Sequence, residues 1–160
     1  MRKVPDERCE RAPAIGTHLR TIARVADDAS QKRLSLEDVV QLLPGTGELM
    51  ASVGNAWWKC AYAARGGNWD LAAYFARRVR GLQRKLAVIR PKYADDLAAF
   101  EAELVEPLLA ACGAHDGPTF ERLFAAATDR ANELHRKWAK PYIRWTLPRE
   151  PPSDLELEAK

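Results

Sequence analysis

The chain has 160 residues, of which 47% are hydrophobic and 29% are charged, and its formal net charge is +3. This length and composition are typical of one globular domain that buries a core without disulfides or metal ions. The weak positive charge does not indicate a nucleic-acid-binding protein. Cys9, Cys60 and Cys112 stand far apart, so their spacing predicts neither a disulfide framework nor a zinc site.

The first residues are charged, and no apolar run of signal-peptide or membrane-spanning length follows them. We therefore expect a cytoplasmic protein with reduced thiols and no membrane contact. Residues 1–45 are predicted to be a polar segment with short helices. Residues 46–147 are predicted to form the main helical domain, and residues 148–160 an extended tail that is acidic and rich in proline.

Two short helices are predicted in the N-terminal segment. Apolar residues recur at helical spacing from Ile15 to Val25, which favours a short amphipathic helix that runs to about Ser30. Ser35 followed by Asp38 predicts the capped start of a second helix, which stops before Pro44.

Four longer helices follow. The first is predicted from Gly47 to Ala64 and the second from Asn68, which caps it, to Ile89. The third follows Pro91, and a kink is expected at Pro107 because proline removes a backbone donor. The fourth begins near Thr119. Short connections favour antiparallel neighbours, so the predicted fold is all-α, an antiparallel four-helix bundle with an additional N-terminal helical segment.

One face of the second helix is basic and the outer face of the third is acidic. Arg77, Arg78, Arg80, Arg84 and Lys85 lie on the basic face. Such a cluster attracts anions, but no aromatic side chains alternate with these cations for base stacking. We therefore expect it to form ion pairs with the acidic third helix and to bind no nucleic acid.

Two blocks of sequence resemble small helical c-type cytochromes of bacteria, which share the bundle plan of cytochrome c′. The first block comprises KCAYA at residues 59–63 and GNWDLAAY at residues 67–74. The second is TDRANELH at residues 128–135, followed by Tyr142-Ile143 and prolines at 148, 151 and 152. In that family the last helix carries Thr-x-x-Cys-Asn-x-Cys-His, so both haem-attachment cysteines are replaced here.

The resemblance implies a former haem site on the last helix. Ala131 and Leu134 stand at the two cysteine positions, and neither side chain can form a thioether, which excludes covalent haem attachment through this motif. Both positions fall on the apolar stripe of the helix, so we expect them in the core, where burial of Leu134 contributes about 1.5–3 kcal/mol. His135 stands at the position of the axial iron ligand and is the candidate cofactor-binding residue.

A ligand pocket is predicted where the haem site would have been. Its candidate residues are Trp57, Trp58, Tyr62, Trp69, Phe124, Ala131 and Leu134. The alternative for the aromatic residues is ordinary core packing. Asn132 and Glu133 are expected on the helix surface, because nothing in their spacing predicts a partner in a pocket.

The leading functional hypothesis is a non-enzymatic binding or interaction protein without a cofactor, which takes a small apolar ligand or a protein partner. The alternative is a redox or sensor protein in which His135 ligates haem, or another metal, without thioether bonds. No nucleophile–base pair, phosphate loop or metal cluster is recognisable, so no catalytic residue and no metal site are predicted. A homodimer in which Trp58 contributes to the contact is a further expectation.

Overall fold

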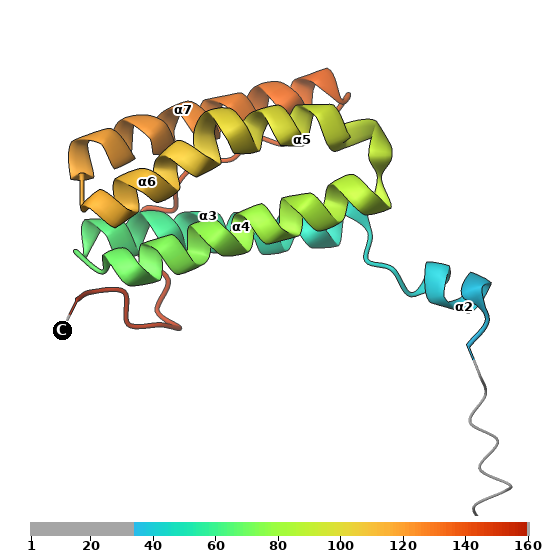
Figure 1. Ribbon diagram of the computed structural model, residues 1–160, viewed down its shortest axis with the longest axis horizontal. Coiled ribbons are helices and arrows are strands. Elements are labelled where there is room, and N and C mark those ends of the chain that lie inside the picture. The colour runs from blue at the N-terminus through green and yellow to red at the C-terminus, as the bar shows by residue number, and fades with distance from the viewer. Residues whose placement is uncertain (1–33, 160) are drawn as a thin grey trace, which may run out of the picture. The chain divides into compact units, whose positions relative to one another are not determined.

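The computed structural model describes residues 34–159 (Figure 1). Residue contacts divide the chain into two units, residues 1–42 and residues 43–160. The helix predicted from Ile15 to about Ser30 lies outside the described residues. In the first unit, α2 (Leu36–Gln41) starts as predicted: the Ser35 hydroxyl accepts from the Asp38 amide and the Asp38 carboxylate accepts from the Ser35 amide, each at 3.0 Å.

The second unit is helical, which confirms the all-α class. Its elements are α3 (Thr46–Arg65), α4 (Trp69–Ile89), the 3₁₀ turn η1 (Pro91–Tyr93), α5 (Ala94–Phe100), the π-helical segment η2 (Glu101–Val105), α6 (Glu106–Ala114) and α7 (Gly117–Lys137). Figure 1 shows α3 and α4 side by side in one layer, with α5, α6 and α7 in the other. Helix α4 contacts α3 and α6, and α7 contacts α6 and α3. No helix within residues 34–159 is both long and apolar enough to cross a membrane.

The core lies between the two layers and is filled by the apolar stripes of the helices. The apolar residues of each stripe fall three and four positions apart, as helical periodicity requires. The largest fully buried side chains are Val53, Cys60, Val79, Val105, Leu108, Cys112 and Phe120. Each long helical segment contributes to this set, so none of them packs independently of the others.

The turn between α3 and α4 depends on glycine. Gly67 has φ of +75°, a left-handed conformation that other residues adopt at a cost. A Cβ at Gly66 would lie 2.9 Å from the Leu157 carbonyl oxygen, so only glycine permits this approach of the C-terminal segment. Asn68 caps α4 as predicted, its side chain accepting from the Leu71 amide at 3.2 Å.

The helix widens into a π-helical turn just before Pro107. Pro107 follows the π-helical segment η2, where the Glu106 amide donates to the Glu101 carbonyl. The wider turn accommodates a residue that cannot donate and whose ring clashes with the preceding turn.

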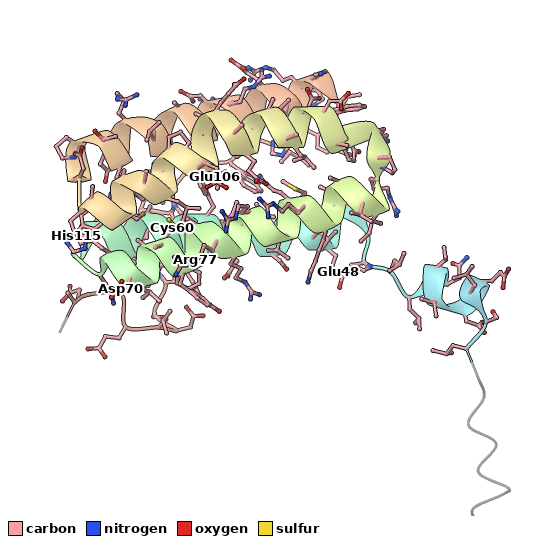
Figure 2. All side chains as sticks on the ribbon, viewed as in Figure 1. Glu48, Cys60, Asp70, Arg77, Glu106 and His115 are labelled. Carbon is pink, nitrogen blue, oxygen red and sulfur yellow. The ribbon has the colours of Figure 1, made fainter. Side chains whose placement is uncertain are left out.

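The acidic side chains of this stretch pair with the basic face of α4. Arg84 pairs with Glu101 at 2.5 Å and Arg80 with Glu106 at 2.7 Å, so part of the basic face meets the acidic helix as expected. Figure 2 labels Glu106 between the layers.

The C-terminal segment folds back to the α3–α4 turn, which sequence patterns did not predict. Leu157 is buried in the core, and Glu158 forms a single antiparallel bridge with Gly67. Lys59, itself only 7% exposed, forms an ion pair with Asp154. A polar, proline-rich sequence thus becomes part of the helical unit, and the buried Leu157 and the ion pair of Lys59 are among the contacts that hold it.

We predict that Leu157→Ala lowers the free energy of unfolding by about 2–3 kcal/mol, because it removes a buried side chain and leaves a void. Leu155, which is 41% exposed, offers a matched control, and Leu155→Ala is expected to cost less than about 0.5 kcal/mol. Urea denaturation of the full chain measures both. Equal losses for the two variants would contradict the packed position of Leu157.

Candidate functional site

A cavity of about 240 Å³ lies at one end of the second unit and is partly open to solvent. It is at the end marked by Glu48 in Figure 2, opposite the end marked by His115. Its walls come from α3, α4, η1, α5, α7 and the segment after α7. The lining residues are Thr46, Gly47, Met50, Gln83, Leu86, Tyr93, Asp96, Leu97, Phe100, Ala131, Leu134, His135, Trp138, Lys140 and Ile143.

Three of the predicted site residues meet at this cavity. Ala131, Leu134 and His135 are separated by three and four positions, so α7 presents them on one face. Ala131 and Leu134 are partly buried and pack against the core. Their side chains do not fill the space beside them.

Asp96 joins α5 to the end of α7 at the rim of the cavity. Its carboxylate accepts from Lys137 Nζ at 2.7 Å and from the Trp138 indole at 2.9 Å. The hydrogen bond from Lys137, and after it the bond from Trp138, lowers the pKa of Asp96 although desolvation opposes this. The carboxylate therefore stays ionised and holds Trp138 as a wall of the cavity.

His135 is held as a neutral imidazole. Burial lowers its pKa below the ordinary value of 6.5, and the charge of Lys140 lowers it further, whereas a hydrogen bond to the Ile143 backbone opposes both. The ring lies against Trp145 with centroids 5.5 Å apart. Its Nδ1 atom is buried and has no hydrogen-bond partner.

Gln83 is the second buried polar group at the cavity. The side chain is 5% exposed, and its Oε1 atom has no hydrogen-bond partner. Within residues 34–159, Gln83 Oε1 and His135 Nδ1 make up the set of buried side-chain nitrogen and oxygen atoms that lack a partner. Sequence reasoning missed Gln83, and its position on the apolar stripe between Val79 and Leu86 is the signal that could have found it.

Asn132 is buried, so the prediction that it lies on the helix surface was wrong. Its Nδ2 donates to the Trp145 carbonyl at 3.0 Å, and its Oδ1 accepts from the Trp145 amide at 2.7 Å. The Asn132 side chain thereby satisfies the backbone N–H and C=O of Trp145, where the chain returns past α7. Sequence spacing could not identify this partner. Its neighbour Glu133 is exposed as expected and pairs with Arg130.

The remaining residues of the predicted pocket do not line this cavity. Trp57 stacks on Phe124 in the core, with centroids 4.5 Å apart, and donates to Thr128. Trp58 is half-buried beside Thr146 and Leu147, around a void of about 10 Å³. The seven residues therefore do not form one pocket, because α3 turns its aromatic side chains toward the core and the C-terminal segment.

Two further aromatic residues of that prediction lie elsewhere. Tyr62 donates its hydroxyl proton to the Pro148 carbonyl and so helps to hold the C-terminal segment. Trp69 stacks on His115 at 5.8 Å, at the end opposite the cavity. Both side chains are used in packing, in agreement with the alternative that sequence analysis left open for them.

The two described thiols lie in the core. Cys60 and Cys112 are free and buried, and Cys60 donates to the Ala72 carbonyl at 3.2 Å. A hydrogen bond with Cys112, together with burial, raises the pKa of the Cys60 thiol, which opposes thiolate chemistry. No group of three or more His, Cys, Asp or Glu side chains in residues 34–159 is placed to hold a metal ion.

Comparison of the chain with protein-family models, with curated proteins and with solved structures found no match. The site must therefore be judged on its own geometry. That geometry is a mainly apolar cavity with one neutral histidine and one buried carboxamide in its wall.

We predict that lowering the pH from 7 toward 5.5 destabilises the protein partly through His135. The unfolded chain takes up the imidazole proton near pH 6.5, whereas the folded protein binds it only at lower pH, so acidification favours unfolding in this window. His135→Gln removes this contribution. The difference in free energy of unfolding between wild type and His135→Gln should change with pH in favour of the variant, and a constant difference would refute the shifted pKa.

Proposed function

We propose that this protein is a non-enzymatic binding protein for a small, mainly apolar ligand, and that the cavity beside Ala131 and Leu134 is its binding site. The single observation that carries the proposal is the cavity of about 240 Å³ itself. Ligand sites are typically concave, mostly apolar and lined by aromatic side chains with a few polar groups that fix orientation. Here Tyr93, Phe100 and Trp138 supply the aromatic walls.

We also propose that the second unit is an antiparallel four-helix bundle of the kind that the c-type cytochrome resemblance implies. The cyclic contacts of α3, α4, α6 and α7, and the short connections between them, support this arrangement. In this view the cavity occupies the region where the resembled family attaches haem, and the cysteine positions have become apolar wall. Bundles commonly build ligand sites from side chains on facing helices.

Haem held by His135 without thioethers is the second candidate. The position of His135 among the residues that line the cavity favours it. The volume opposes it, since pockets for drug-sized ligands measure about 300–1,000 Å³ and the haem macrocycle is larger than most such ligands. The residues present therefore do not fit an enclosed haem, and the small apolar ligand is the better account of the cavity.

We predict that naphthalene binds the wild-type chain and that Ala131→Phe weakens this binding at least about tenfold, because the larger side chain occupies the cavity. Ala125 is exposed on the same helix, so Ala125→Phe is the matched control and should leave binding unchanged. Chemical-shift titration in wild type provides a test that needs no variant. The Trp138 indole signal should shift, whereas that of Trp69, at the opposite end, should not.

The proposal fails if naphthalene shifts no signal of the cavity wall in the wild-type chain. It also fails if Ala131→Phe, with helical content and unfolding midpoint close to wild type, binds as well as the Ala125→Phe control. Either result would make the cavity a packing defect.

We predict that haem added to the purified chain gives no Soret band that depends on His135. Absorption spectra of wild type and His135→Ala during a haem titration measure this. A saturable band in wild type that is absent in His135→Ala would overturn the small-ligand proposal in favour of the haem alternative.

A further inference from the structure

Three lysines lie at the aromatic wall of the cavity. Lys92 Nζ is 4.9 Å from the ring centroid of Tyr93 and 5.8 Å from that of Trp138, and Lys137 Nζ is 5.7 Å from that of Trp138. Lys140 is itself a lining residue. Tyr93 and Trp138 belong to the same lining and meet edge to face, with centroids 4.7 Å apart. The three lysines therefore gather at one side of the cavity.

Two of these lysines have no carboxylate partner. Lys137 pairs with Asp96 at 2.7 Å, whereas neither Lys92 nor Lys140 forms an ion pair with any other residue of the range 34–159. Within that range, Asp96 is the one carboxylate among the residues that line the cavity. Three positive charges thus stand against one negative charge, so this wall has an excess of positive charge.

The charge of Lys140 reaches the cavity itself. Burial lowers the pKa of His135 most, and the positive charge of Lys140 lowers it further. Since His135 lines the cavity, a charge that acts on its ring also acts on a ligand beside that ring. Glu48 and Asp95, which are close in the chain to lining residues, are exposed and do not line the cavity.

The cavity suits a molecule with an apolar body and one charged group. Its volume is about 240 Å³ and it is partly open to solvent. Since a dry cavity of about 150 Å³ accommodates benzene, this volume suits a body of one or two rings. A charged group at the open mouth keeps part of its hydration, so the full cost of burying a charge does not arise. A carboxylate in that place meets the unpaired lysines.

Resting on the function proposed above, we infer that the ligand is an apolar molecule of one or two rings that carries a carboxylate. The rings fill the cavity, and the carboxylate lies at the mouth, where Lys92 and Lys140 attract it. Charge then sets specificity, because a neutral molecule of the same shape lacks this attraction and a cationic one meets an excess of positive charge.

Two probes of the same shape test this inference in the full chain. 2-Naphthoate and 2-naphthamide share the ring system and a planar substituent of similar size, but only the naphthoate is charged at neutral pH. In wild type at low ionic strength, 2-naphthoate should bind at least about fivefold more tightly, as expected for two exposed charge pairs. Added sodium chloride should reduce this advantage, because salt screens exposed charges.

Substitution of the two unpaired lysines identifies the source of the advantage. In the double variant Lys92→Gln/Lys140→Gln, the advantage of 2-naphthoate should fall below about twofold, while 2-naphthamide binding remains. Arg78 and Arg122 are exposed and do not line the cavity. Arg78→Gln/Arg122→Gln therefore removes the same two charges as a matched control, and the advantage should persist in it.

The outcomes separate this inference from the proposed function. If naphthalene binds wild type but the two probes bind equally, the inference is overturned and the cavity remains a binding site. An advantage of 2-naphthoate that survives in the lysine variant, or that is lost equally in the control, also overturns it, because the cavity lysines are then not its source. Failure of naphthalene and of both probes to bind wild type overturns the proposed function, and this inference with it. The wild-type comparison stands even where a variant does not fold.

Discussion

The double hydrogen bond between Asn132 and the backbone of Trp145 is the interaction on which the candidate site depends. Both polar ends of the Asn132 amide are used, at 3.0 and 2.7 Å, so the chain that leaves α7 is fixed at a definite point along the helix. Upstream, the Lys140 amide bonds to the His135 carbonyl at 2.8 Å, and Ala139 takes a left-handed φ of 56°. These contacts position Lys140 and Ile143 as part of the cavity wall.

Residues 131–135 of α7 therefore make contacts on two sides of the helix. Asn132 faces the returning chain, whereas Ala131, Leu134 and His135 face the cavity. The returning chain also sets the environment of His135, since Trp145 packs against the ring and the backbone of Ile143 raises the histidine pKa against the effect of burial. The neutral state and the orientation of the histidine thus follow from the path of residues 138–145 and not from α7 alone.

Local features were predictable from sequence where the signal lies within a few residues. The caps at Ser35 and Asn68 depend on neighbours three positions away, and the helical class depends on a period of 3.6 residues. Pro107 predicted a kink in the third long helix. The sequence could not show that a π-helical turn would accommodate the proline. These predictions share one property, which is that the partner of each residue lies close by in the chain.

The rest of the site depends on partners that are distant in the chain. Asn132 and Trp145, Lys59 and Asp154, and Gly66 and Leu157 meet only when the C-terminal segment folds back, and its polar sequence has no periodicity that indicates this. The aromatic residues of the predicted pocket illustrate the same limit. Helical spacing placed Trp57 on an inward face, but only the packing decides that Phe124 covers it.

The cavity bears on whether Ala131 and Leu134 serve as core packing alone. If core packing alone determined the residues at 131 and 134, larger side chains would fill the space, because side chains that border an unfilled space lose packing contacts. Core packing would also replace Gln83 by an apolar residue, since a buried carboxamide without a partner destabilises the fold. The small residue at 131 leaves space that side chains do not fill, and binding of a ligand there, as proposed above, would offset the stability that this space costs.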